Sequence, residues 1–102
     1  MSAIAYSVIT TLPDEATASE YIAWLEDGHV DEVVRGGAHS AMIVRIEEPP
    51  GSIQVETRYV FANRDAFDRY VSTVAPRLRA DGLARFGPER GIFMQRRVGR
   101  VL

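Results

Sequence analysis

Two β-rich runs joined by a single short link constrain this chain more than any other feature of its sequence. Residues 38–47 and 53–61 are rich in β-branched and aromatic side chains, and the link from Glu48 to Ser52 contains two prolines and a glycine. Such a link suits a tight reversal of the chain, so the two runs predict an antiparallel hairpin. The segments before and after the hairpin must then complete its sheet and cover it.

The segment before the hairpin predicts one strand followed by a helix. Residues 3–11 are β-branched and nearly uncharged, which is typical of a central strand buried on both faces. Thr17 and Glu20 have the spacing of a capping box, so we expect a helix to open there. Gly28 interrupts the helical pattern, and a second helical piece is expected to run to the Gly36-Gly37 pair. The apolar helical face consists of Ala18, Tyr21, Ile22, Leu25, Val30, Val33 and Val34.

The segment after the hairpin predicts a helix followed by a strand. Asn63 can cap a helix, and Pro76 is expected to end or kink it. Residues 75–86 predict a further helical segment, and residues 92–101 predict the last strand. The apolar face of these helices consists of Phe67, Tyr70, Val71, Val74, Leu78, Leu83 and Phe86.

This order of elements predicts an α+β fold of the ferredoxin-like βαββαβ kind, with residues 1–102 as a single domain. Right-handed crossovers turn it into a four-stranded antiparallel sheet with the helices on one face. The hairpin face expected to take the helices carries Met42, Val44, Ile46, Val55, Thr57, Tyr59 and Phe61. The opposite face is expected to carry His39, Ala41, Ile43, Arg45, Gln54, Glu56, Arg58 and Val60. Ile43 and Val60 would leave that face too apolar for water, so we expect a face-to-face homodimer.

Further motifs carry a family resemblance. Trp24, the run His29 to Val34, Gly37 and residues 75–87 resemble an uncharacterised bacterial family of the dimeric α+β barrel superfamily, over the whole chain. The resemblance implies two ferredoxin-like chains packed sheet to sheet around a cavity, and it carries no activity. Relatives by fold include cofactor-independent antibiotic-biosynthesis monooxygenases, haem-degrading monooxygenases, small isomerases and cyclases, and stress-responsive barrel proteins. Haem-degrading relatives normally place an axial histidine on the second helix, and residues 63–86 contain no histidine.

The composition excludes several classes of protein. The absence of cysteine excludes disulfides, thiolate catalysis and cysteine-based zinc sites. No run approaches the roughly 20 apolar residues that span a bilayer, and the first residues lack a basic flank, so no membrane association and a cytoplasmic location are expected. A net charge of −2 gives a nucleic acid little to bind.

The charge is distributed unevenly. Residues 1–51 carry nine acids against two arginines, whereas residues 52–102 carry five acids against ten arginines. This polarity can steer an anionic ligand to the C-terminal half, or it can be a solvated surface that complements a neighbour. Both interpretations stay open.

No nucleophile triad, phosphate loop, dinucleotide fingerprint or metal-ligand spacing is present, so no metal or cofactor is expected. Candidate chemistry therefore rests on residues that can line a cavity. On the open side of the hairpin, Arg45 or Arg58 can hold an anionic or enolate oxygen while Glu56 or His39 moves a proton. An ion-pair cluster at the dimer interface explains the same four residues.

A second candidate group lies around the break in the first helix. His29 follows Gly28 there, next to Tyr21 and Trp24, and its ordinary pKa suits general base work at neutral pH. Histidine at such a place is also a common capping or packing residue. Tyr6 and Tyr59 can stack on an aromatic ligand, or they can be core packing.

Two functions follow from these residues. One is a non-catalytic homodimer that binds a small hydrophobic or anionic metabolite. The other is a cofactor-independent monooxygenase, isomerase or cyclase that acts on an aromatic or polyketide-like metabolite, with His29, Glu56 and Arg58 as candidate catalytic residues. A cavity without room for a benzene ring counts against the second.

Overall fold

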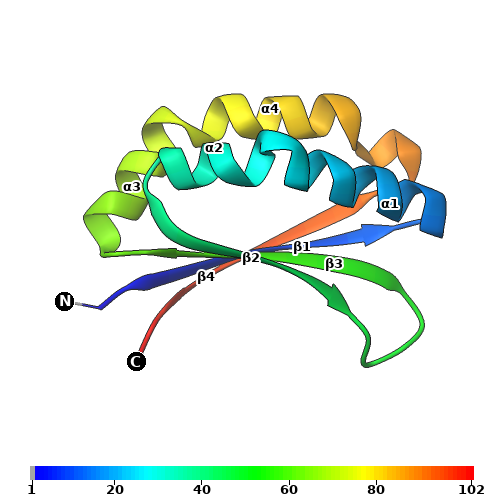
Figure 1. The fold of residues 1–102 in the computed structure, drawn as a ribbon, viewed down its shortest axis with the longest axis horizontal. Coiled ribbons are helices and arrows are strands. Elements are labelled where there is room, and N and C mark those ends of the chain that lie inside the picture. The colour runs from blue at the N-terminus through cyan, green and yellow to red at the C-terminus, as the bar shows by residue number, and fades with distance from the viewer. Residues whose placement is uncertain (1) are drawn as a thin grey trace.

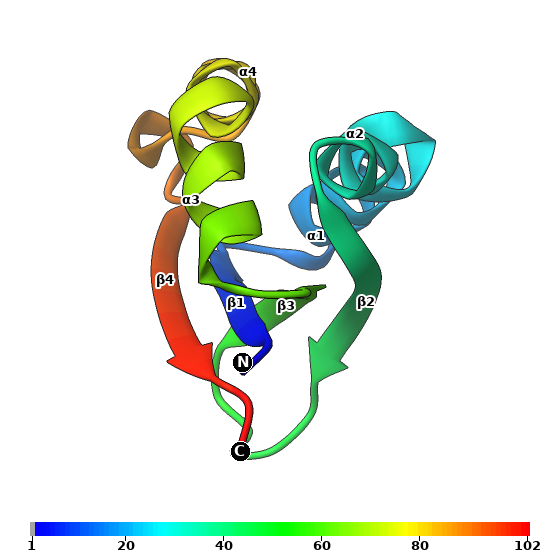
Figure 2. The same cartoon turned by 90° about the vertical axis from the view of Figure 1, so that its left-hand side faces the viewer.

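The chain folds into one four-stranded antiparallel sheet with helices on one of its faces, in a computed structural model that describes residues 2–102 (Figures 1 and 2). The elements in chain order are β1 (Ile4–Leu12), α1 (Glu15–Trp24), η1 (Leu25–His29), α2 (Val30–Arg35), β2 (Ala38–Ile46), β3 (Ile53–Phe61), α3 (Arg64–Thr73), α4 (Ala75–Arg85), η2 (Pro88–Arg90) and β4 (Phe93–Arg100). The strand order is β2-β3-β1-β4, and every neighbouring pair is antiparallel. The ferredoxin-like α+β fold predicted from the sequence is therefore confirmed.

The helix ends follow from capping side chains. Asn63 accepts a hydrogen bond from the Ala66 backbone N–H and opens α3, as predicted. The start predicted for the first helix is wrong, because Asp14 is the capping residue: its carboxylate accepts from the Thr17 N–H, and α1 begins at Glu15. The carboxylate satisfies one of the backbone donors that a helix leaves free at its first turn.

The faces predicted for β2 are also wrong. Directly paired residues of antiparallel strands share a face, and Ala41, Ile43 and Arg45 pair with the helix-facing residues of β3. Met42 pairs with Arg58 and Val44 pairs with Glu56, so they lie on the open face. Both alternations of β2 contain apolar residues, Ala41 and Ile43 in one and Met42, Val44 and Ile46 in the other, so the hydrophobic pattern did not identify the helix-facing side correctly.

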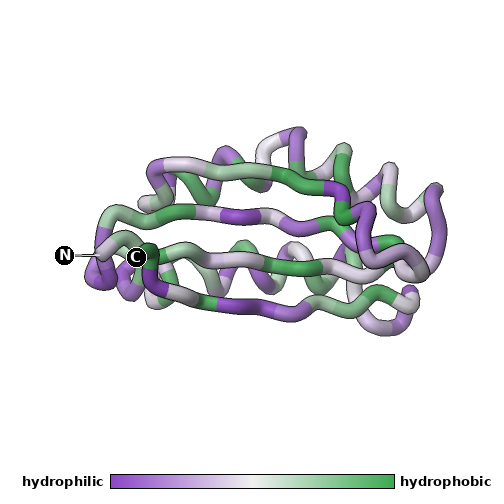
Figure 3. The backbone as a smooth tube through the Cα atoms, turned by 90° about the horizontal axis from the view of Figure 1, so that it is seen from below, coloured by the Kyte–Doolittle hydropathy of each residue, from purple (hydrophilic) through white to green (hydrophobic). Residues whose placement is uncertain are grey.

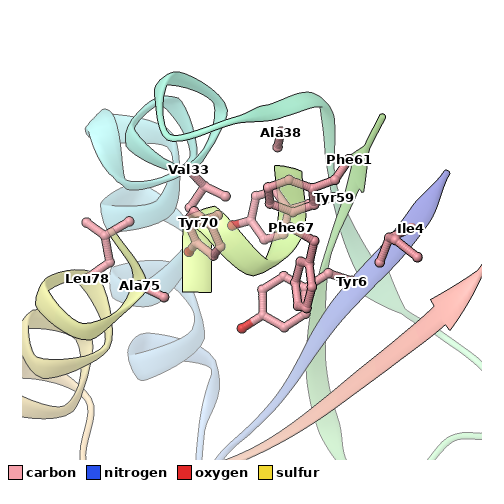
Figure 4. Close-up of a cluster of buried hydrophobic side chains, with 10 residues drawn as sticks. All are labelled: Ile4, Tyr6, Val33, Ala38, Tyr59, Phe61, Phe67, Tyr70, Ala75 and Leu78. Carbon is pink, nitrogen blue, oxygen red and sulfur yellow. The ribbon is translucent and has the colours of Figure 1, made fainter. Parts of the chain in front are cut away.

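Two apolar clusters fill the space between the sheet and the helices. One lies towards α3 and contains Tyr6, Tyr59, Phe61, Phe67 and Tyr70 among its buried residues (Figure 4). The other lies towards α1 and is built by Leu12, Ala18, Tyr21, Leu25, Val55, Phe86 and Ile92. In Figure 4 the hydroxyl ends of Tyr6, Tyr59 and Tyr70 lie on the side of the cluster where Ala75 and Leu78 of α4 are found.

Among the described residues, no element covers the face of the sheet that lies away from the helices (Figure 3). Its apolar side chains include the two most exposed large hydrophobic residues of the strands, Met42 at 57% and Phe93 at 62% exposure. The strand register places Ala5, Ile9, Val44, Ile46 and Val60 on the same face. Within residues 2–102, no helix is long and apolar enough to cross a membrane.

Candidate functional site

A cavity of about 40 Å³ lies between the sheet and the helices, where the two apolar clusters meet. About 10–15 Å³ is needed for one water molecule, so the cavity holds about three waters, whereas a benzene ring needs a cavity of about 150 Å³. Its walls come from β1, α1, η1, α2, β3, α3, α4 and β4. The lining residues are Tyr6, Val8, Tyr21, Trp24, His29, Val33, Thr57, Tyr59, Tyr70, Leu78, Arg79, Gly82, Met94 and Arg96.

Two guanidinium groups meet at one phenol oxygen in this cavity. Arg96 Nε donates to the Tyr6 hydroxyl at 3.2 Å, and Arg79 donates through Nη2 to the same oxygen at 3.5 Å. Tyr6 lies on the central strand β1, Arg96 lies on β4 directly opposite Val8 of β1, and Arg79 lies on α4. Three segments far apart in the sequence therefore bring three polar groups to one point.

Among the described residues, neither guanidinium group finds a carboxylate partner. Within residues 2–102, no carboxylate lies within 4.0 Å of Arg79 or Arg96, although six other arginines form ion pairs. Arg79 Nε is buried without any hydrogen-bond partner. Because the Tyr6 oxygen accepts from both guanidinium groups, its own proton is free to be donated to a further acceptor. The cavity thus presents donors and positive charge with no protein acceptor to match.

The other tyrosines of the wall stay protonated at neutral pH. Burial raises the pKa of Tyr70 to about 12 and raises the pKa of Tyr59 further. Burial also raises the pKa of Tyr21, whose hydroxyl is hydrogen-bonded to Thr10 Oγ1 at 2.9 Å. These side chains give the cavity an aromatic wall. Because they stay neutral, they do not offset the positive charge of the two arginines.

Trp24 and His29 form a stacked pair at the α1–η1 side of the cavity. Their ring centroids are 4.1 Å apart with an interplanar angle of 24°, and both side chains are half-buried. The backbone between them departs from helical geometry at Asp27 and at Gly28, where φ is +116°. A positive φ is free of steric strain only in a residue without a Cβ, so glycine at this position allows the turn that places His29 beside Trp24.

Replacing Gly28 with Ala is expected to destabilise the protein by about 1–3 kcal/mol through backbone strain alone. A Cβ at this position meets no atom within 4 Å, so steric clash does not contribute. Chemical denaturation measures the change. The matched control is Gly82→Ala in α4, whose Cβ makes an ordinary contact of 3.5 Å with Trp24 and whose φ is not positive. Equal stability of Gly28→Ala and the wild type contradicts the prediction.

The titration of His29 is expected to contribute to the pH dependence of the free energy of unfolding. Burial lowers the pKa of its imidazole below the ordinary value of 6.5, with smaller opposing effects from Asp81 and Glu32. The native state therefore binds fewer protons than the unfolded state, so stability is highest above pH 6.5 and falls as the pH drops below it. The slope is at most about 1.4 kcal/mol per pH unit for one proton. Denaturation of wild type and His29→Gln between pH 7.5 and 5 should show a flatter profile for the variant; parallel profiles contradict this.

The structure separates the candidate residues predicted from the sequence into two sets. Five of them line the cavity: Tyr6, Tyr21, Trp24, His29 and Tyr59. Glu56 and Arg58 lie on the open face, where they pair with each other at 3.1 Å.

The remaining two residues do not lie where the sequence predicted them. Arg45 lies on the helix side of β2 and pairs with Glu15 at 2.6 Å, because the register of β2 is the opposite of the predicted one. His39 is exposed at an irregularity of the β2 register between Ala38 and Ser40, outside the lining of the cavity.

Sequence reasoning missed Arg79 and Arg96. The excess of arginine in the C-terminal half indicated that a site for an anion could lie there. It could not distinguish these two arginines from the eight others in that half. Among the described residues, no three His, Asp or Glu side chains gather in a way that could hold a metal ion.

Comparison with known proteins identifies the family. The family model described as a domain of unknown function (DUF4286) matches residues 3–98. The chain belongs to this family. No curated protein matches this DUF4286 chain.

Solved structures share the fold of this DUF4286 chain at low sequence identity. A dimeric ferredoxin-like protein from an uncultured marine organism has a TM-score of 0.82 and 11% identity, over 100% of this chain and 97% of that one. An ethyl tert-butyl ether d (ethd) family protein from Bacillus halodurans has a TM-score of 0.74 and 10% identity, over 100% of both chains. SnoaB, a cofactor-independent oxygenase from Streptomyces nogalater, has a TM-score of 0.68 and 12% identity, over 100% and 95%. At these identities the likeness shows the fold alone.

Proposed function

We propose that this DUF4286 chain binds a small anionic metabolite in the cavity between sheet and helices, and that it does so as a homodimer. The observation that carries this proposal is the convergence of Arg79, Arg96 and the Tyr6 hydroxyl without a protein carboxylate to balance them. The guanidinium groups only donate, and the Tyr6 hydroxyl still has its proton to donate, so together they are complementary to a ligand that only accepts, such as a carboxylate or another oxyanion.

The cavity volume limits the size of this ligand. About 40 Å³, room for about three waters, accommodates a carboxylate with about one further atom, and it does not accommodate a benzene ring while the walls keep this arrangement. Of the hydrophobic and anionic ligands expected from the sequence, the anionic ligand is therefore favoured. Met94, Val8 and Leu78 supply apolar contacts for a short body.

The second part of the proposal is that a twin subunit covers the open face of the sheet. Met42 and Phe93 are the most exposed of its apolar side chains, and β2 also presents Val44 and Ile46 on this face. Exposed apolar side chains on an uncovered sheet face of a small domain favour an association surface, and here they flank the Glu56–Arg58 ion pair of the same face. The marine ferredoxin-like protein of the same fold is described as dimeric, which supports the proposal. The cytoplasmic location expected from the sequence stays a prediction.

A cofactor-independent oxygenase, isomerase or cyclase is the second candidate. The fold of SnoaB supports it, because SnoaB is described as a cofactor-independent oxygenase. The cavity volume argues against an aromatic or polyketide-like substrate in the present arrangement, by the criterion that the sequence suggested.

Trp24 is the single tryptophan of the chain and lines the cavity, so its fluorescence reports occupancy directly. Titration with sodium acetate, at constant ionic strength held with sodium chloride, is expected to give a saturable change with a dissociation constant on the order of 1 mM. Acetamide, which has the same shape without the charge, is the matched control and should give no saturable change. A linear response to acetate, or the same response to acetamide, contradicts the proposal.

A further inference from the structure

The sheet ends in β2 on one side and in β4 on the other, and β4 is the more regular of these two edge strands (Figure 2). The register of β2 is irregular between Ala38 and Ser40, and the arginine of β2, Arg45, already pairs with Glu15. Irregularities of this kind protect an edge strand from pairing with another chain. β4 pairs with β1 without a break over its whole length, and within residues 2–102 no strand pairs with its outer side. A further strand can therefore be added at β4.

The backbone of β4 presents hydrogen-bonding groups to the outside at every second residue. The Val101 backbone N–H donates to the Ala3 carbonyl oxygen at 2.9 Å, so the odd-numbered residues of this register exchange their hydrogen bonds with β1. The even-numbered residues then direct their N–H and C=O groups away from the sheet. These residues are Met94, Arg96, Val98 and Arg100. Backbone groups in this position are a template for the backbone of another extended chain.

The side chains of these four residues alternate between apolar and cationic. Their partners in β1 include Tyr6 and Ile4 of the core, so all four side chains lie on the helix side of the sheet. Val98 is 46% exposed there. Within residues 2–102, neither Arg96 nor Arg100 has a carboxylate within 4.0 Å. An open groove of about 560 Å³ is lined by Val98, Arg100 and Ile4, so there is room for further side chains beside this edge.

We propose that the β4 edge binds an extended peptide in which apolar and acidic side chains alternate at every second residue. The peptide adds as a fifth strand antiparallel to β4, in keeping with every other pair of the sheet. Its carboxylates lie opposite Arg96 and Arg100, and its apolar side chains lie opposite Met94 and Val98. A twin subunit on the open face leaves this row free, because the four side chains lie on the helix side.

A second copy of β4 is a less suitable occupant of this edge. Residues 93–102 contain three arginines and no acidic residue. Two such strands paired antiparallel about Val98 place Arg96 of each copy opposite Arg100 of the other, and like charges directly opposite each other are destabilising. The charge of the edge therefore favours an acidic chain. Arg100 lies outside the cavity between sheet and helices, so this inference does not depend on the proposed anion binding.

The test is the fluorescence anisotropy of a labelled, amidated peptide, Glu-Thr-Val-Thr-Glu-Thr-Val, which runs antiparallel to β4 from Arg100 to Met94. A saturable rise is expected in about 0.15 M salt, which screens distant charges, and the same peptide with lysine for glutamate should give none. Arg100→Glu should weaken binding about 10-fold, because a repulsion replaces an attraction across the two strands. Arg69→Glu is the matched control, because Arg69 is exposed on α3 outside the groove, and it should bind the peptide like wild type.

Backbone pairing is tested separately by N-methylation of the peptide. Its glutamates and valines direct their amides to β4, whereas its threonines direct theirs away. Methylation of the two valine amides should abolish binding, and methylation of two threonine amides should retain it. The reverse result shows that the peptide is not added as the proposed strand and overturns the inference.

Three further outcomes also overturn it. The absence of saturable binding by the glutamate peptide leaves the arginines of β4 as protection of an edge strand against aggregation. Equal weakening by Arg69→Glu and Arg100→Glu, with circular dichroism showing both variants folded, reduces the binding to non-specific attraction. A wild-type mass above that of a dimer, measured by light scattering at tens of micromolar protein, shows that another copy of the chain occupies the edge.

Discussion

Met42→Glu is expected to convert the protein from a dimer into a monomer. Met42 lies on the open face of the sheet and is 57% exposed in a single chain, so a carboxylate there is hydrated in the monomer. Arg58 lies directly opposite, but it already pairs with Glu56 at 3.1 Å, so the new carboxylate has no free cationic partner. In a face-to-face dimer the same carboxylate loses its water in both subunits. An unpaired buried charge costs about 3 kcal/mol or more, so the dimer dissociation constant should rise at least about 100-fold.

Light scattering coupled to size exclusion measures this at tens of micromolar protein, where the wild type should have twice the mass of one chain. Leu83→Glu is the matched control, because Leu83 is 53% exposed on α4, on the opposite side of the molecule from the open face. It should leave the mass unchanged. A monomeric wild type, or a Met42→Glu variant that stays dimeric with native circular dichroism, refutes the sheet-to-sheet interface.

The fold could be predicted because its signals are local. The hairpin link, the Asn63 cap and the helical spacing of Phe67 and Tyr70 each identify an element without knowledge of the rest of the chain. The faces of β2 could not be predicted in the same way, since they depend on the register with β3 across the link. Ile43 and Val44 are equally suitable for a core, and only the pairing decides which of them meets the helices.

The candidate site shows the same distinction between local and long-range information. Trp24 and His29 were found because a glycine break and two rings lie within six residues of each other. The meeting of Tyr6, Arg79 and Arg96 joins β1, α4 and β4, and no spacing in the sequence reports it. An arginine with a buried, unpartnered nitrogen is recognisable only after the neighbours are placed around it.

Arg79→Met is expected to raise the stability of the unliganded protein and to weaken anion binding. The guanidinium has one buried nitrogen without a partner, a weak hydrogen bond at 3.5 Å to Tyr6, and the positive charge of Arg96 beside it. An unsatisfied buried donor costs about 1–3 kcal/mol, and methionine fills a similar volume without a polar atom. We therefore expect the free energy of unfolding to increase by about 1 kcal/mol. The loss of a charge-assisted hydrogen bond should weaken acetate binding about 10- to 100-fold.

Chemical denaturation at fixed protein concentration measures the first effect, and Trp24 fluorescence measures the second. Arg77→Met is the matched control, because Arg77 is exposed on the same helix and pairs with Glu32 at 2.8 Å at the surface. Exposed pairs contribute about 0–1 kcal/mol, so this variant should change stability little and leave acetate binding as in wild type. The opposite signs expected for stability and binding are what distinguish a ligand-holding arginine from a structural one. An Arg79→Met variant that is less stable and binds acetate normally would show that Arg79 serves only the fold, since a charge kept for a ligand destabilises the empty protein.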